Sequence, residues 1–131
     1  MGDKKNIMKR ERSAIISVSD KSNLKLVLDI LKKNNIKIIS SGGTYKKIQK
    51  LKYKCIEVSS FTGFNEILQG RVKTLHPKIH AGILCKRNSK SHIRDLKKNN
   101  YEKIDFVITN FYPFQETLRK TNNHKKIIEN I

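Results

Sequence analysis

The chain has 131 residues, the size of one ordinary domain, and 37% of them are hydrophobic, which argues against disorder throughout. It carries 29 Lys and Arg against 11 Asp and Glu, a formal charge of +18 that is typical of proteins binding nucleic acid or an acidic membrane face. The lysines, however, are scattered with Asn and Ile through stretches such as LKKNNIKII, the bias that an AT-rich genome produces on solvated faces. We therefore expect neither nucleic acid nor a membrane as the main partner.

No apolar run has the length or flanks of a secretory signal or a membrane span. Cys55 and Cys85 lie far apart and carry no C-x-x-C spacing, so we expect free thiols in a reducing compartment rather than a disulfide or a zinc site. The sequence predicts a soluble, cytoplasmic protein.

Strands and helices alternate along the chain. Residues 1–12 are polar and predict a loose N-terminal tail, and residues 13–131 predict a single domain. The expected strands are 13–18, 37–39, 54–58 and 105–109. Three helices are expected between them. The first follows the N-cap oxygens at 19–22, the second runs from SSGGT to about residue 52, and the third spans 89–99. This alternation predicts an α/β fold, a doubly wound, mostly parallel sheet with helices on both faces, where ligands bind beyond the carboxyl ends of the strands.

Two strand-end stretches could together hold an anion. SSGGT places a glycine pair, Gly42 and Gly43, at the start of a helix, where backbone N–H groups approach a phosphate closely. SVSDK sets Lys21 after the first strand as a counter-charge. Each stretch alone is equally consistent with a tight turn or a capped helix, and neither matches a Walker A or G-x-G-x-x-G pattern.

The stretch GRVKTLHPKIHAG concentrates basic residues between Gly70 and Gly82. An extended backbone would send Arg71 and Lys73 to the same side, one to clamp a phosphate and one to act on a reacting group. His76 and His80 have the spacing of two metal ligands on a helix, but Pro77 argues against a helix there and no third ligand is close in sequence. We expect no metal, and histidines that bond to a loop or a substrate.

The motifs SVSDK, SSGGT, FTGFNEILQGRVKTLHPKIHAGIL and NFYPF occur in this order over residues 12–117. They resemble the IMP cyclohydrolase domain of the bifunctional purine-biosynthesis enzymes that also carry AICAR transformylase activity. The resemblance implies a methylglyoxal-synthase-like α/β domain, an enzyme that closes a formamido-imidazole-carboxamide ribonucleotide to IMP with loss of water, and a homodimer within a longer chain. It implies no cofactor for this reaction; 10-formyltetrahydrofolate would serve the transformylase domain, which the chain lacks.

The resemblance also implies roles for particular residues. Lys73 would face the formyl oxygen as a catalytic cation, Tyr112 would hydrogen-bond in the reacting region, and Asn110 would contact the base. The remaining implied residues bind the nucleotide, mostly its 5′-phosphate: Ser17, Ser19, Lys21, Ser41, Gly42, Gly43, Thr44, Arg71 and Thr74.

Members of the family continue after NFYPF into an Asp-Ile-Gly-Gly segment and a lysine-bearing helix, so the resemblance implies a chain truncated at its C-terminal end and weak activity in isolation. Two alternatives share the fold. A regulatory nucleotide-binding module would not need a lysine aimed at a reacting group, and methylglyoxal synthase needs a carboxylate near its phosphate loop, for which only Asp20 is a candidate.

Overall fold

The computed structural model describes residues 10–129, so the first nine residues of the expected tail lie outside the described range. Its centre is a sheet of four strands in the order β3-β2-β1-β4, and every neighbouring pair is parallel. The strands are β1 (Ser13–Ser17), β2 (Lys37–Ser40), β3 (Ile56–Glu57) and β4 (Phe106–Thr109). The chain winds from β1 outward to β3 and then returns to the other side of β1, which confirms the predicted doubly wound α/β fold.

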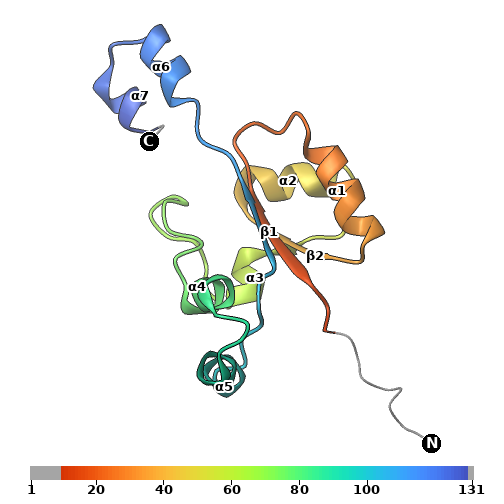
Figure 1. The fold of residues 1–131 in the computed structure, drawn as a ribbon. Coiled ribbons are helices and arrows are strands. Elements are labelled where there is room, and N and C mark those ends of the chain that lie inside the picture. Colours follow the sequence, from red (N-terminus) through yellow and green to blue (C-terminus); the bar gives the residue numbers. More distant parts are fainter. Residues whose placement is uncertain (1–9, 130–131) are drawn as a thin grey trace, which may run out of the picture.

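Helices cover both faces of this sheet (Figure 1). On one face, α1 (Leu24–Lys33) and α2 (Gly42–Lys50) pack against Ala14 and Ile16 of β1. On the other, α3 (Val58–Thr62) and α4 (Pro77–Leu84) pack against Ile15. Successive side chains of a strand point to opposite faces, so the continuous apolar run of β1 supplies both halves of the core.

Three helices end in the same left-handed turn. The helices are α1, α2 and the predicted polar helix, α5 (Lys90–Lys98). One residue beyond the C-cap of each, Asn35, Lys52 and Asn100 have φ of 54°, 67° and 57°. In each turn the next N–H bonds to a carbonyl five residues earlier: Ile36 to Leu31 (2.9 Å), Tyr53 to Ile48 (3.2 Å) and Tyr101 to Leu96 (2.8 Å). These are Schellman caps, in which Asn tolerates the left-handed conformation, and they explain why the KKNN stretches end helices.

The interpretation that Pro77 argues against a helix between His76 and His80 was wrong. Pro77 is the first residue of α4, a position where the missing N–H costs nothing. His76 is the N-cap, and its Nδ1 accepts a hydrogen bond from the Lys78 N–H (3.0 Å), while the His80 ring donates to the His76 carbonyl (3.1 Å). Both histidines therefore bond within their own segment, and residues 10–129 hold no group of three His, Cys, Asp or Glu suited to a metal ion.

Two further boundaries differ from the sequence prediction. The expected strand at 54–58 is only two residues long, because Val58 already begins α3 and is buried in the core. The first helix begins at Leu24 with Asn23 at the N-cap and no side-chain cap bond. The Asp20 carboxylate instead accepts a hydrogen bond from the Ser22 N–H (2.9 Å), which lowers its pKa.

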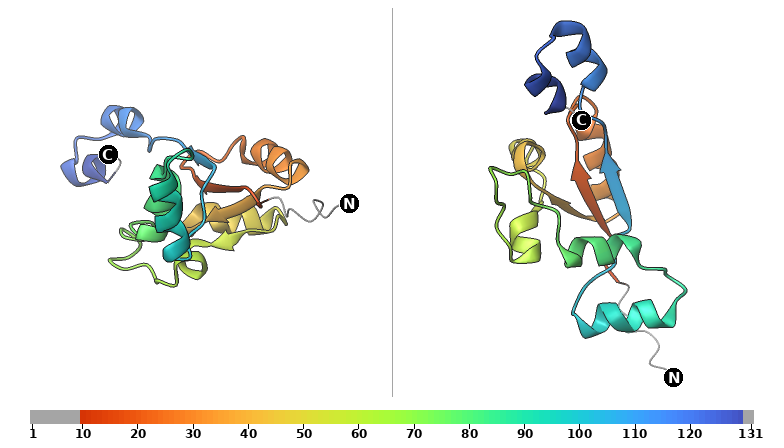
Figure 2. Two further views of the ribbon diagram at one scale, coloured as in Figure 1. Left: turned by 60° about the horizontal axis from the view of Figure 1, so that its bottom comes forward. Right: turned by 90° about the vertical axis from the view of Figure 1, so that its left-hand side faces the viewer.

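Beyond β4 the chain leaves the sheet. Two short helices, α6 (Phe114–Lys120) and α7 (His124–Ile128), contact each other and have no buried residue. Figures 1 and 2 show this pair standing away from the sheet and its covering helices. An ion pair between Glu129 and Arg71 connects its end to the segment before α4.

The amino end of the sheet is held by internal bonds. Asp105 forms an ion pair with Arg10 and accepts a hydrogen bond from the Ser13 N–H (2.9 Å). Burial opposes the charge on Asp105, but these two bonds outweigh it and lower the pKa of its carboxyl. Residues 10–12, placed in the tail by the sequence prediction, also bond to the domain through the Arg12 carbonyl and the Lys37 N–H (2.9 Å).

Both cysteines are free, as predicted. Burial, with a smaller contribution from Glu57, raises the pKa of the Cys55 thiol to about 12. None of the helices in the described part of the chain is both long and apolar enough to cross a membrane.

Candidate anion-binding site

The start of α2 presents unpaired backbone N–H groups. Gly42, Gly43 and Thr44 occupy the first helical turn, where N–H groups have no acceptor within the helix. Ser41 is the N-cap, yet its side chain makes no cap bond, and the first turn contains no acidic residue. The helix dipole adds about half a positive charge at this end, so the geometry favours an anion.

Two lysines lie against the two glycines. A Cβ built on Gly42, whose φ is +56°, would lie 3.0 Å from Lys73 Nζ, and one built on Gly43 would lie 3.9 Å from Lys21 Nζ. Lys21 Nζ donates to the carbonyl oxygens of Val18 (2.9 Å) and Ser19 (3.2 Å). Lys73 is a half-buried residue, and its Nζ forms no hydrogen bond or ion pair with residues 10–129. Lysines from two distant segments therefore flank one uncapped helix end.

Hydrogen bonds join the ends of three strands around this point. Thr44 Oγ1 accepts from the Val18 N–H (3.2 Å) and donates to the Val18 carbonyl (3.1 Å), which ties α2 to the loop after β1. Asn110, after β4, accepts from the N–H groups of Ser19 (2.7 Å) and Asp20 (3.3 Å) and donates to the Asp20 carbonyl (2.9 Å). The Thr44 hydroxyl and the Asn110 amide thus shape the loop from within the protein.

The other residues singled out from the sequence are less tightly grouped. Ser17 ends β1 and is exposed, and Thr74 is half-buried next to Lys73 in sequence. Arg71 bonds to Glu129, whereas Lys73 lies against Gly42, so these two basic side chains meet different neighbours. Tyr112 lies on the segment leading out to α6 and is 57% exposed.

A cavity of about 230 Å³ is lined in part by residues that the sequence analysis did not predict as site residues. Ser41 and Lys73 line it together with Glu57, Val58, Ser59, Phe64, Asn65 and Glu66. A Cβ built on Gly70 would lie 3.5 Å from a Glu66 carboxylate oxygen and 3.6 Å from Lys73 Nζ, so both charged groups face this glycine. Glu57 could have been predicted as a site residue, because it lies at the carboxyl end of β3. Nothing in the sequence pointed to Glu66, because its placement depends on the turn that brings Ile67 opposite Val72.

The arrangement can hold an anion at the helix end, stabilise negative charge with Lys73 and exchange a proton through a carboxylate close to that lysine.

The sequence model of one protein family, the MGS-like domain, matches residues 24–131, and the chain belongs to that family.

The curated relatives narrow this class to one domain of a larger protein. The bifunctional purine biosynthesis protein PurH of Acetivibrio thermocellus is 49% identical over 121 residues, and that of Fusobacterium nucleatum is 46% identical over 118. These matches cover 92% and 90% of this chain but only 24% and 23% of the relatives. The chain thus corresponds to the MGS-like domain of PurH and spans about a quarter of its length.

A solved structure shares the fold. The crystal structure of ForH superposes with a TM-score of 0.72 and 28% sequence identity, covering 78% of this chain and 52% of that one.

Proposed function

We propose that this chain is the IMP cyclohydrolase part of a purine-biosynthesis protein, acting in the cytoplasm. The observation that carries the proposal is Lys73, a half-buried residue whose ammonium has no partner among residues 10–129 and lies against Gly42 at the uncapped start of α2. The names of the relatives support purine biosynthesis as the setting. The transformylase activity and homodimer formation belong, in this proposal, to a longer PurH-like protein.

The substrate phosphate binds at the first turn of α2. Its negative charge meets the N–H groups of Gly42, Gly43 and Thr44 and the ammonium of Lys21, which already approaches Gly43. The serine hydroxyls at 17, 19 and 41 supply donors around it. This side of the site needs little rearrangement, because Thr44 and Asn110 already fix the loop.

The reacting groups lie on the Lys73 side of the helix end. The carboxamide nitrogen attacks the formyl carbon and loses a proton to a base, while the formyl oxygen becomes anionic and is stabilised by Lys73. That oxygen is protonated to a hydroxyl and leaves as water when it takes up a second proton; the C–O bond breaks as the formamido nitrogen loses its proton and forms a C=N double bond, so the ring closes without change of oxidation state. The reaction therefore needs no redox cofactor. Glu66 faces Gly70 together with Lys73 and is the nearest candidate in the described structure for relaying the proton.

The proposal is tested by following IMP formation from the formylated ribonucleotide. We expect the 131-residue chain to exceed the uncatalysed rate while remaining well below the Acetivibrio thermocellus PurH measured in parallel. Lys73→Ala should abolish the excess, and Lys90→Ala, which removes an exposed lysine from the start of α5, should retain it. If the chain binds IMP but never exceeds the uncatalysed rate, it is a nucleotide-binding module and the proposed activity is wrong.

A further inference from the structure

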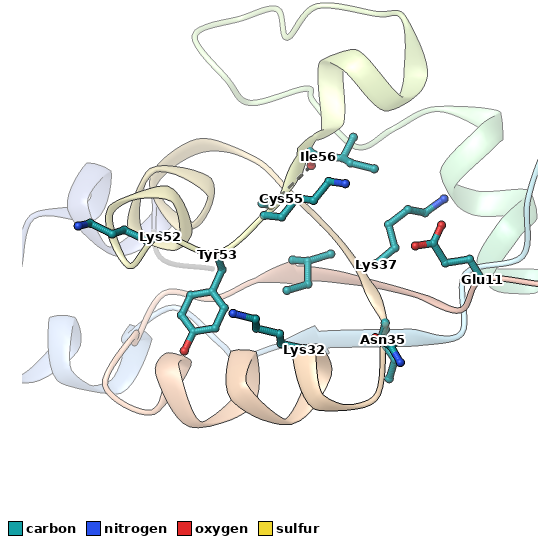
Figure 3. A pocket seen from close by; sticks show the side chains of 11 residues that line it. Glu11, Lys32, Asn35, Lys37, Lys52, Tyr53, Cys55 and Ile56 are labelled. Carbon is teal, nitrogen blue, oxygen red and sulfur yellow. Dashed lines mark hydrogen bonds between the residues drawn. The ribbon is translucent and has the colours of Figure 1, made fainter.

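A second, larger cavity lies at the opposite end of the sheet. Its volume is about 590 Å³, within the usual range for small-molecule sites. It opens between the end of α1 and the 52–56 segment that leads into β3, above the first residues of β2 (Figure 3). We call it the lysine groove, after the four lysines that line it: Lys32, Lys37, Lys52 and Lys54.

The charge of the lysine groove is mostly uncompensated. Lys37 forms an ion pair with Glu102 (2.7 Å), and Glu11 is the one carboxylate among the lining residues. Lys32, Lys52 and Lys54 form no ion pair with the described part of the chain; Lys32 lies near Asp29, but Lys25 already pairs that carboxylate (2.9 Å). The ends of α1 and α2 contribute only about half a negative charge each. A net positive field therefore remains, which favours an anionic ligand.

The interior of the groove is apolar and has one flat wall. Ile36 and Ile38 are buried beneath it, with 8% and 5% of their surfaces exposed. Tyr53 forms the wall: its hydroxyl bonds to Asp29, which holds the ring in place, and Lys32 Nζ lies 5.8 Å from the ring centre. Figure 3 shows Lys32 beside Tyr53, with the Lys32 ammonium directed toward the ring. An aromatic wall over aliphatic side chains suits a flat ring system.

We propose that the lysine groove binds a phosphorylated small molecule with a flat aromatic ring, of the size of a nucleotide. The ring lies along Tyr53 and Ile38, and the phosphate groups meet Lys32 and Lys54 at the rim. This site is separate from the α2 helix end, which lies at the carboxyl end of the sheet, and the inference does not rest on the proposed function.

A single tryptophan makes the test specific to the groove. The chain contains no Trp, so Tyr53→Trp introduces the only indole, and ADP is the probe. We expect ADP to quench the Trp fluorescence saturably and adenosine to bind at least about tenfold more weakly. Adding Lys32→Ala and Lys54→Ala should weaken ADP about tenfold, while Lys90→Ala on α5 should not. Tyr101→Trp, after α5, is the control indole and should not respond.

Several results would contradict the inference. These are equal binding of ADP and adenosine, an unchanged affinity after removing Lys32 and Lys54, or loss of the signal on Lys73→Ala, which would place ADP only at the start of α2. A short single-stranded oligonucleotide that displaced ADP at far lower concentration would show a nucleic-acid surface instead. In the unmutated chain, ADP should shift the amide NMR signals of residues 35–38 and 52–56, so a misfolded Trp variant does not decide the matter.

Discussion

The two sides of the candidate site differ in how firmly they are built. The phosphate side, residues 17–21, 41–44 and 110, is fixed by hydrogen bonds between the ends of β1, β2 and β4. The reactive side, residues 63–76 with Tyr112, is mostly exposed at residues 63–69, contains left-handed residues at Leu68, Gln69 and Gly70, and leaves Lys73 unpaired among residues 10–129. In the proposed function, the phosphate side is therefore preorganised, whereas Lys73 on the reactive side has no partner among residues 10–129. The difference indicates that affinity and turnover depend on separate residues.

The largest expected effect separates the two sides at Lys73. In a full-length version of the enzyme, Lys73→Ala should lower kcat by roughly a hundredfold or more and change KM modestly, because the ammonium stabilises charge that develops on the formyl oxygen. Steady-state kinetics of IMP formation, with Lys90→Ala as control, measures this. A rise in KM with an unchanged kcat would show that Lys73 binds the substrate and does not act on the reacting groups, which would contradict the difference between the two sides.

Two of the three left-handed glycines among residues 10–129, Gly42 and Gly63, allow a matched test of the contact between the sides. Gly42→Ala and Gly63→Ala both place a Cβ at positive φ, and each should cost about 1 kcal/mol of unfolding free energy. Only the Gly42 Cβ meets Lys73 Nζ, at 3.0 Å; nothing lies within 4 Å of the Gly63 Cβ. We expect Gly42→Ala alone to lower kcat, by about tenfold, because its Cβ displaces the Lys73 ammonium, while IMP affinity falls no further than in Gly63→Ala. Equal kcat values for the two variants would mean that the contact between Gly42 and Lys73 does not position the ammonium.

Asn110 tests whether the phosphate side is preorganised. Asn110→Ala removes three hydrogen bonds to the Ser19–Asp20 loop and should weaken IMP about fivefold while leaving kcat nearly unchanged. Asn99→Ala, which removes one bond to the Asp95 carbonyl at the end of α5, is the control for stability. If inosine affinity falls as much as IMP affinity, Asn110 contacts the base, as the family resemblance implies, instead of positioning the loop.

The smallest effect is expected at the ion pair between Arg71 and Glu129. Both side chains are more than half exposed, so Glu129→Gln should change the unfolding free energy by less than about 0.5 kcal/mol. Releasing Arg71 should leave IMP affinity the same or slightly tighter, since the guanidinium becomes free to meet the phosphate. A clear loss of affinity would show that α7 holds Arg71 in its binding position.

The sequence predicted the phosphate side better than the reactive side, for a physical reason. Parallel strands place their carboxyl ends at one edge, so SVSDK and SSGGT could be brought together from the alternation alone. The extra helix at Val58 and the start of α4 at Pro77 could not be predicted from this alternation, because these helices form where Val58 and Ile79 are buried in the core. Glu66 approaches Lys73 only through the turn that pairs Ile67 with Val72, a contact that no periodicity records.

Calorimetry with IMP and inosine tests the central claim most directly. The two ligands share a base and a ribose and differ only in the phosphate. If the start of α2, with Lys21 beside Gly43, is a phosphate site, IMP should bind at least about a hundredfold more tightly than inosine, a difference of a few kcal/mol. Equal affinities for the two would show that no phosphate is held there and would contradict the account.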